Sequence, residues 1–330
     1  MSEIAIKTKR GKISNCPTSF NGPLTEPVQT VIKSISDKTG LSVHRIRLTI
    51  PTASDDKPQE PNQKKRDTVL DPALPLSTYF SATSTNSPII YVKDLGPQIQ
   101  WRTVFFIEYF GPLLIHPIFY FGQKAIYGST FEHSRVQQLA FIFTMLHFIK
   151  REFETAFVHH FSLDTMPVFN VFKNSSHYWF LSGINLAYFI YAPESYVAPE
   201  KSIISRFLFG RNIVPLGATT LYVLSALWLF AELSNGWTHL ILSSLRSDGS
   251  KTRKIPYGYG FNLVSVPNYF FESLGWFAIL LITQNWTSLL FFTVSTTQMW
   301  FWGVKKHRRY RKEFGDKYPK NRKIYVPFVI

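Results

Sequence analysis

The stretch Thr103–Phe121, with the sequence TVFFIEYFGPLLIHPIFYF, decides the fold class of this chain. It carries a single formal charge, at Glu108. As an α-helix it would be about 28 Å long, close to the ~30 Å hydrocarbon core of a bilayer. We therefore predict a transmembrane helix. Because ionisable side chains are costly in lipid, we expect Glu108 to line an internal cavity.

Other apolar segments predict a multi-pass α-helical membrane protein. The composition is in keeping with this class, since 45% of the 330 residues are hydrophobic, 16% are aromatic and only 17% are charged. We predict six transmembrane helices, with a seventh span near Asn235–Arg246 as the alternative. The five further candidates are Val136–Phe157, His177–Ala192, Ile213–Glu232, Phe270–Ile282 and Trp286–Gly303.

The basic residues predict the orientation in the membrane. The formal net charge is +15, and Lys305–Lys323 alone holds ten Lys/Arg against two acidic residues. Six passes place this tail and the basic loop Arg246–Lys254 in the cytosol, together with the N-terminus, which agrees with the positive-inside rule. A basic stretch that follows an apolar segment indicates topology and anionic ligands, so we expect no nucleic-acid partner.

The first part of the chain has a different pattern. It predicts a cytosolic α+β domain at residues 1–96 with a ubiquitin-like (β-grasp) fold, followed by a membrane-embedded domain at residues 97–330. The polar segment 51–86 predicts a long flexible loop. The lone Cys16 excludes a disulfide framework. The expected elements are strands at Ile4–Lys9, Val43–Ile50 and Ile89–Val92, and a helix at Pro27–Gly40.

Polar side chains recur at helical spacing in two of the apolar segments. If the helix after Leu229 is continuous, then Asn235, His239 and Arg246 lie within about 40° of one another around its axis. They would form a polar stripe, although an interfacial helix with a solvated face is an equal alternative. In the VPNYFFE stretch, Asn268, Tyr269 and Glu272 share one face near a helix start at Pro267. Tyr269 alone could instead belong to an aromatic belt.

Two charged stretches could bind a ligand. KKHRRYRKEF places His307 and Tyr310 three residues apart among cations that could bind phosphates or a lipid headgroup. Near the end of the second apolar segment, Arg151, Glu152 and Glu154 are either a solvated helix end or a cavity lining. We predict no metal site, because the adjacent His159 and His160 would face different sides of a helix. The sequence has no G-x-G-x-x-G, no P-loop and no G-x-S-x-G motif.

Three separated motifs together resemble one family. KREFETAFVHHFS followed by TMPVFNVFKNSSHYW, then FNLVSVPNYFFE, and the closing HRRYRKEFGDKYPKNRKIYVPFVI resemble the very-long-chain trans-2-enoyl-CoA reductases of the steroid 5-alpha-reductase family. The resemblance covers nearly the whole chain and includes the ubiquitin-like N-terminus, which the steroid enzymes lack. It implies NADPH-dependent reduction of a trans-2-enoyl-CoA to the saturated acyl-CoA, the last step of fatty-acid elongation, which supplies sphingolipid synthesis.

The resemblance also implies roles for individual residues. Tyr269 corresponds to the proton donor of the family, and Glu108 to a carboxyl that assists it. Two positions differ from the steroid reductases, since His239 stands where an aspartate is usual and Trp302 where an arginine is. The implied NADPH-binding residues are Arg151, Asn235, His239, Arg246, Asn268, Glu272, His307 and Tyr310.

The implied setting is the endoplasmic reticulum membrane, with both termini in the cytosol. The implied partners are the acyl-CoA substrate, membrane lipids and other enzymes of the elongation complex. Two other classes remain open from the residues alone. One is a related membrane steroid or polyprenol reductase or methyltransferase, and the other is a non-enzymatic membrane adaptor that displays a ubiquitin-like domain. Only an enzyme requires Glu108, Asn268, Tyr269 and Glu272 to converge on a cavity.

Overall fold

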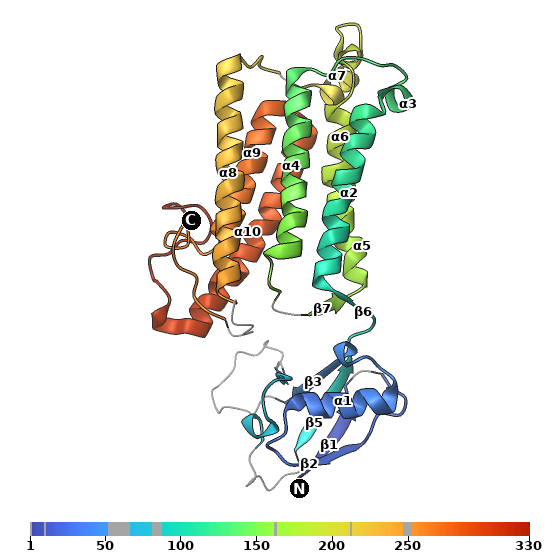
Figure 1. Ribbon diagram of the computed structural model, residues 1–330, viewed down its shortest axis with the longest axis vertical. Coiled ribbons are helices and arrows are strands. Elements are labelled where there is room, and N and C mark those ends of the chain that lie inside the picture. Colours follow the sequence, from blue (N-terminus) through green and yellow to red (C-terminus); the bar gives the residue numbers. More distant parts are fainter. Residues whose placement is uncertain are drawn as a thin grey trace. The chain divides into compact units, whose positions relative to one another are not determined.

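The structure is a computed structural model that describes residues 2–9, 11–51, 67–80, 88–161, 164–211, 213–246 and 253–330. It divides into two compact units (Figure 1). The first contains residues 1–100 with 165–168, and the second contains residues 101–164 with 169–330. Each unit is described by itself.

The first unit is a mixed β-sheet packed against one helix. Strands β1 and β5 are parallel, and the other neighbouring pairs are antiparallel. The sheet order is β2-β1-β5-β3-β4. The elements are β1 (Ser2–Thr8), β2 (Ser19–Gly22), α1 (Val28–Thr39), β3 (Ile46–Ile50), β4 (Thr68–Val69) and β5 (Ile89–Asp94).

Apolar periodicity explains how α1 packs. Val28, Val31, Ile32 and Ile35 are spaced three or four apart and are all buried, as one face of a helix requires. They form a core with alternate residues of the strands. The helix ends at Gly40, whose φ of 71° is the left-handed conformation that glycine adopts without a Cβ clash.

Two details of the expected domain are wrong. The strand expected at Val43–Ile50 begins only at Ile46, because a 3₁₀ turn at Val43–Arg45 precedes it. Residues 67–80 are not part of a loop, because they form β4 and a 3₁₀ turn at Leu76–Thr78, and buried Leu70 and Leu76 anchor them in the core. The rest of the predicted loop, residues 52–66 and 81–86, lies outside the described residues. A further pair of strands, β6 (Gln98–Gln100) and β7 (Thr165–Pro167), completes the unit.

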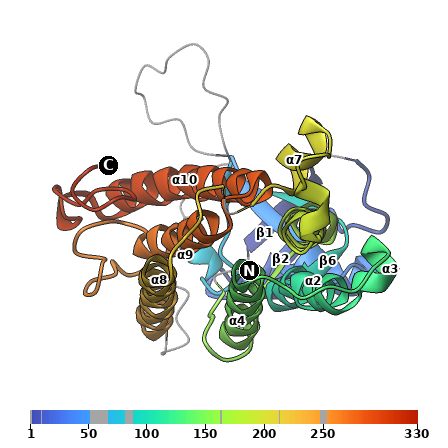
Figure 2. The ribbon, with the colours of Figure 1, turned by 90° about the horizontal axis from the view of Figure 1, so that it is seen from above.

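The second unit is a helical bundle. Helices α2 and α4 pack together, as do α8 and α9, and α9 and α10 (Figure 2). A π-helix at His177–Asn185 joins α5 to α6. The helices are α2 (Trp101–Phe121), α3 (Gln123–Tyr127), α4 (Arg135–Phe157), α5 (Phe169–Ser176), α6 (Leu186–Ile190), α7 (Ile203–Phe209), α8 (Ala218–Ser244), α9 (Pro267–Thr283) and α10 (Trp286–Phe314).

Local sequence explains the helix starts. Ser134 and Gln137 form a reciprocal capping box at the start of α4. Pro267 occupies the first turn of α9, as predicted. The helix predicted at Ile213–Glu232 starts later, at Ala218, because Pro215 and Gly217 delay it. It continues past the predicted end at Glu232 to Ser244, so the condition on which the stripe of Asn235 and His239 depends is met, whereas Arg246 lies beyond the helix end.

The apolar surface of the bundle faces outward. Phe121 and Phe157 are 74% and 75% exposed, and many other large apolar side chains lie beside them on the surface. Among the described helices, α2 alone is both long and apolar enough to cross a membrane by length and hydropathy. Charged residues lower the hydropathy of α4 and of the end of α10. The six-pass count therefore stays a prediction.

Candidate functional site

Four ionisable side chains lie on one face of α4. His147, Lys150, Arg151 and Glu154 are spaced three or four residues apart, so they project toward α8 and α9 together. His147 and Glu154 are almost completely buried. Such residues inside an apolar bundle need partners, because an unpaired buried charge is strongly destabilising.

His147 and Lys150 bind carboxylates from two other helices. His147 Nδ1 lies 2.8 Å from Glu232 Oε1 on α8, and its Nε2 lies 3.3 Å from Glu272 Oε1 on α9. Lys150 Nζ donates to Glu232 Oε2 at 2.8 Å and to Asn235 Oδ1 at 2.6 Å. Asn235 Nδ2 in turn donates to Glu272 Oε2 at 3.1 Å and to the backbone carbonyl of Asn268 at 2.8 Å. One polar cluster thus connects α4, α8 and α9.

Arg151 extends this cluster toward α2. Its Nη1 donates to Glu154 Oε2 at 2.6 Å and lies 3.2 Å from His239 Nδ1. His239 Nδ1 is also 2.9 Å from Glu154 Oε2. Arg151 Nη2 donates to the hydroxyl of Tyr109 on α2 at 2.8 Å. Arg151 is therefore not a solvated helix end, because its guanidinium is held by partners on three helices.

Two buried carboxylate oxygens in this region have no hydrogen-bond partner among the described residues. They are Oε1 of Glu108 and Oε1 of Glu154, and the latter lies 3.6 Å from Lys150 Nζ, an ion pair beyond hydrogen-bond distance. Glu108 is 2% exposed on α2, interacts electrostatically with Arg151, and has the side-chain amide of Asn174 as a hydrogen-bonding neighbour. Buried acceptors without donors are rare in proteins, so these two atoms mark places where a ligand could donate a hydrogen bond.

Tyr269 lies in a second group of side chains. The Nζ of Lys306, on α10, is 4.6 Å from the centroid of the Tyr269 ring, and the ring of Trp302 is 6.3 Å away. Tyr325 donates its hydroxyl to the Tyr269 carbonyl at 3.0 Å. Within the described part of the chain, no contact joins the side chains of Tyr269 and Glu108. Glu108 and Tyr269 therefore do not contact each other directly, although the sequence predicts that they converge on one cavity with Asn268 and Glu272.

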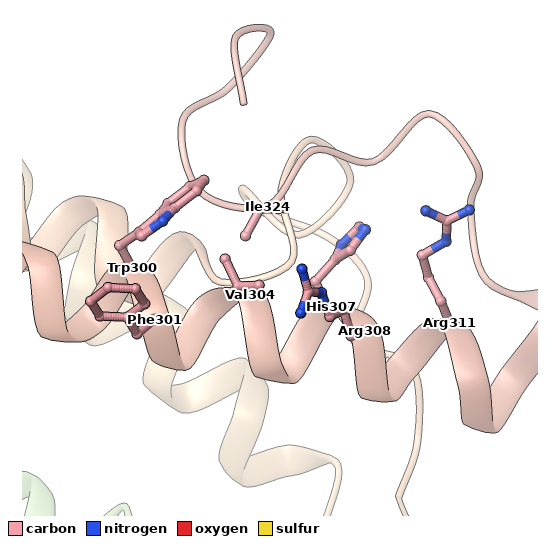
Figure 3. A pocket seen from close by; sticks show the side chains of 7 residues that line it. All are labelled: Trp300, Phe301, Val304, His307, Arg308, Arg311 and Ile324. Atoms are coloured by element: carbon pink, nitrogen blue, oxygen red, sulfur yellow. The ribbon is translucent and has the colours of Figure 1, made fainter. Parts of the chain in front are cut away.

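The basic end of α10 forms the rest of the second group. Lys306 interacts electrostatically with both Tyr310 and Arg246. Arg246 follows the end of α8, and its Nη1 donates to the His160 carbonyl at 2.5 Å. His307 Nδ1 lies 2.6 Å from the Ser265 hydroxyl. Figure 3 shows His307, Arg308 and Arg311 reaching from α10 to line a pocket of about 540 Å³ beside Ile324.

One carboxylate and two histidines beside the first group come close enough together to be compared with a metal site. Ligand atoms of Glu154, His159 and His239 lie within 4.8 Å of one another. However, the Arg151 guanidinium bonds the same Glu154 oxygen that an ion would need. An ion-pair network accounts for this arrangement without a cation.

The predicted site residues thus fall into two groups. Arg151, Asn235, His239, Asn268 and Glu272 belong to the first, and Tyr269, Arg246, His307 and Tyr310 to the second. Sequence reasoning missed several members of the first group. His147 and Lys150 had a recognisable signal, because they lie four residues before Arg151 and Glu154, respectively, in an otherwise apolar helix. Glu232, on α8, had only its isolated charge as a signal. The missed residues are His147, Lys150 and Glu232.

Comparisons with known proteins identify the family. Residues 164–330 match the family model described as 3-oxo-5-alpha-steroid 4-dehydrogenase, which is a membrane family. The chain is 41% identical over 330 residues to the very-long-chain enoyl-CoA reductase of Dictyostelium discoideum, covering 100% of both chains. It is 44% identical to a Schizosaccharomyces pombe protein named for a proposed enoyl reductase activity, covering 99% of each. It is 31% identical to the trans-2,3-enoyl-CoA reductase-like protein of Mus musculus, over 77% of this chain and 68% of that one. The chain therefore belongs to the very-long-chain enoyl-CoA reductases within the 3-oxo-5-alpha-steroid 4-dehydrogenase family.

Proposed function

We propose that this protein reduces the trans-2 double bond of a very-long-chain enoyl-CoA with NADPH, as the last step of fatty-acid elongation in the endoplasmic reticulum. The observation that carries the proposal is the phenol of Tyr269 held under the Lys306 ammonium, in a chain of the enoyl-CoA reductase family. The alternatives, a steroid or polyprenol reductase and a non-enzymatic adaptor, have less support, since the relatives are named enoyl reductases.

The residues present fit a dinucleotide phosphate. Arg308 and Arg311 line one pocket beside His307, and Lys306 and Arg246 lie near Tyr310 in the same group, so this end of α10 supplies the cations that phosphate binding requires. The unpartnered oxygens of Glu108 and Glu154 could accept hydrogen bonds from a polar ring system. When bound, the nicotinamide would supply a hydride to C3 of the enoyl thioester.

The protein's own contribution would be proton transfer and placement. Tyr269 would give its phenolic proton to C2, which completes the saturated bond. Lys306 would stabilise the phenolate left behind, because its ammonium lies beside the ring. The ion pairs between α4, α8 and α9 would hold Asn235 and Glu272 in place, since each has at least two fixed partners.

We also propose that the first unit has the β-grasp fold. Support comes from the sheet order β2-β1-β5-β3-β4, its parallel central pair β1 and β5, and the single helix α1 packed on one face. Its role beside the membrane enzyme, including any contact with other elongation enzymes, is a separate question from catalysis.

An assay with the purified full-length protein in detergent tests the proposed activity. A C18 or longer trans-2-enoyl-CoA should be reduced to the saturated acyl-CoA with NADPH, followed at 340 nm and by product mass. NADH should serve less well. A protein that binds NADPH but leaves the enoyl-CoA unchanged would contradict the substrate assignment.

The orientation can be tested separately. With six passes, protease added to sealed microsomes should remove the first unit from the cytosolic side. Protection of that unit until detergent is added would contradict the six-pass orientation and favour a seventh span.

A further inference from the structure

A second pocket lies at the opposite end of α4 from the polar cluster. Its volume is about 340 Å³, within the range of ligand sites. Residues at the starts of α4 and α8 line it, together with Arg211 from the segment between α7 and α8 and with Glu194 and Val197 from the turn before α7. Arg135, at its wall, is twelve residues before His147, so the two lie about 18 Å apart along the helix. The pocket is therefore separate from the proposed enoyl-CoA reductase site.

Arg211 is a buried cation with incomplete pairing. Its side chain is 4% exposed, yet Nε and Nη2 have no hydrogen-bond partner among the described residues. Nη1 donates to the Phe209 carbonyl at 3.3 Å. The nearest carboxylate, on Glu194, is 4.0 Å from Nη2, beyond hydrogen-bond distance, and is 77% exposed. A guanidinium in this state requires an anionic acceptor, because burial removes its water without replacing the hydrogen bonds.

Two helix N-termini add to the positive potential. The Ser134 capping box satisfies two N–H groups of α4, and the N–H groups of Arg135 and Val136 are left without an intrahelical partner. At α8, Gly217 has no side chain to cap the first turn, and Ala218 lines the pocket. Free N–H groups and the helix dipole at such ends favour a phosphate or a carboxylate.

The rest of the lining indicates an amphiphilic ligand. Val136, Leu216 and Leu221 form an apolar wall beside Arg211. The neighbouring helix α7 exposes Ile203, Ile204 and Phe207. We propose that this pocket binds the phosphate of a phospholipid headgroup, with the acyl chains along the apolar wall. Inorganic phosphate carries the same anionic group as the headgroup and is the alternative ligand.

Full-length protein, purified in a maltoside detergent free of phosphorus, can be titrated with three probes. They are dioleoylphosphatidylglycerol, dioleoylglycerol with the same tails but no phosphate, and inorganic phosphate. We expect the phosphatidylglycerol to raise the thermal midpoint and to remain bound in native mass spectrometry, and dioleoylglycerol to do neither. Stabilisation by millimolar inorganic phosphate alone, equal to that by the lipid, would overturn the lipid assignment.

Variants test whether Arg211 makes the contact. Arg211→Gln should weaken phosphatidylglycerol binding about tenfold or more, because a charge-assisted bond to phosphate is lost. Arg211→Lys should retain part of the affinity. Arg206→Gln, which removes an exposed arginine on α7, is the matched control and should bind like the wild type. If Arg211→Gln does not fold, the comparison of the two lipids on the wild type still decides. Equal effects of the two lipids on the wild type, or equal binding by Arg211→Gln, would refute the proposal.

Discussion

The two units of this protein place their charges in opposite ways. In the first unit the core is apolar, and the ion pairs Lys9–Asp67 and Arg45–Asp94 lie at the surface. In the helical unit, His147, Glu154 and Glu232 are buried, while phenylalanines such as Phe121 cover the outside. The first arrangement suits water and the second suits lipid. The contrast teaches where charge is informative. The ion pairs of the first unit lie at the surface, whereas the buried charges of the helical unit mark the candidate site.

The largest effect is expected at Tyr269. Tyr269→Phe removes one oxygen and almost no volume, so the fold should be retained. Turnover of enoyl-CoA should fall roughly 10²- to 10⁴-fold, the usual contribution of a positioned acid. Steady-state kinetics and NADPH titration should show lost turnover with nearly unchanged cofactor affinity.

Tyr222→Phe provides the control for this change. Tyr222 is an exposed phenol on α8, so the variant should keep wild-type turnover. If Tyr269→Phe is stable and stays within about threefold of the wild type, Tyr269 is not the donor and is better described as an aromatic-belt residue.

The buried ion pairs provide the second test. Glu232→Ala removes the carboxylate that both His147 and Lys150 bind, so the partly buried Lys150 ammonium loses its closest carboxylate and His147 keeps only Glu272. The loss of stability should be about 3–5 kcal/mol, as for other broken buried pairs. Denaturation in detergent should show it, whereas Glu200→Ala, at an exposed position, should behave like the wild type. Equal midpoints for both variants would mean that the cluster is solvated and not buried.

Arg246 is expected to give a smaller effect. Arg246→Ala removes a cation that interacts with Lys306 and faces the same group as Tyr310. Loss of one charged hydrogen bond to a phosphate corresponds to about a tenfold weaker NADPH affinity. Fluorescence titration would measure this, with exposed Lys201→Ala as the control. Unchanged affinity together with normal membrane insertion would favour a headgroup anchor at the basic end of α10.

The smallest effect belongs to the surface pair of the first unit. Hydrogen bonds from Arg45 lower the pKa of Asp94 from its usual value. A lowered folded-state pKa means that the stabilisation is present above about pH 4, where the unfolded aspartate is ionised, and is lost as pH falls through the folded pKa. The protection factors of β3 and β5 in the full-length protein, which are exchange rates corrected for the pH dependence of intrinsic amide exchange, should therefore fall on acidification.

Asp94→Asn should remove most of this acid dependence, whereas Asp37→Asn, at an exposed position on α1, should keep it. An identical acid profile for wild type and Asp94→Asn would show that the pair contributes nothing measurable, as holds for many surface pairs.

Local signals made much of the fold predictable. The apolar periodicity of α1, the proline at the start of α9 and the apolar run of α2 each depend on residues close in sequence. Strand β2 and β4 were missed because both are short and are stabilised by pairing with distant strands. The π-helix at His177–Asn185 gave no recognisable signal, because its hydrogen bonding differs from that of an α-helix without a distinctive composition.

The candidate site was predictable in part. The stripe of Asn235, His239 and Arg246 was predicted from helical spacing, and the structure places the first two against α4. Arg246 lies beyond the end of α8 and bonds the His160 carbonyl, so it is not part of the stripe. The partners Glu154 and Glu232 could not be paired in advance, because which helices are neighbours is decided by packing of the whole bundle. The contact of Tyr269 with Lys306 on α10 has the same origin. Asn268 and Tyr269 are adjacent, and adjacent helix positions differ by about 100° around the axis, so neighbours in sequence can face different groups.

If α10 spans the membrane, its length sets how far its basic end stands from the hydrocarbon core. Its 29 residues extend about 43 Å, whereas the hydrocarbon core of a bilayer is about 30 Å thick. If Trp286 begins at one face of the core, the last two or three turns must stand clear of the other face as a stiff rod. The Lys and Arg side chains of those turns would then bind a phosphate at a fixed distance from the hydrocarbon, on the order of 10 Å. Insertion of one helical turn into α10 would increase this distance without substituting any of the basic residues.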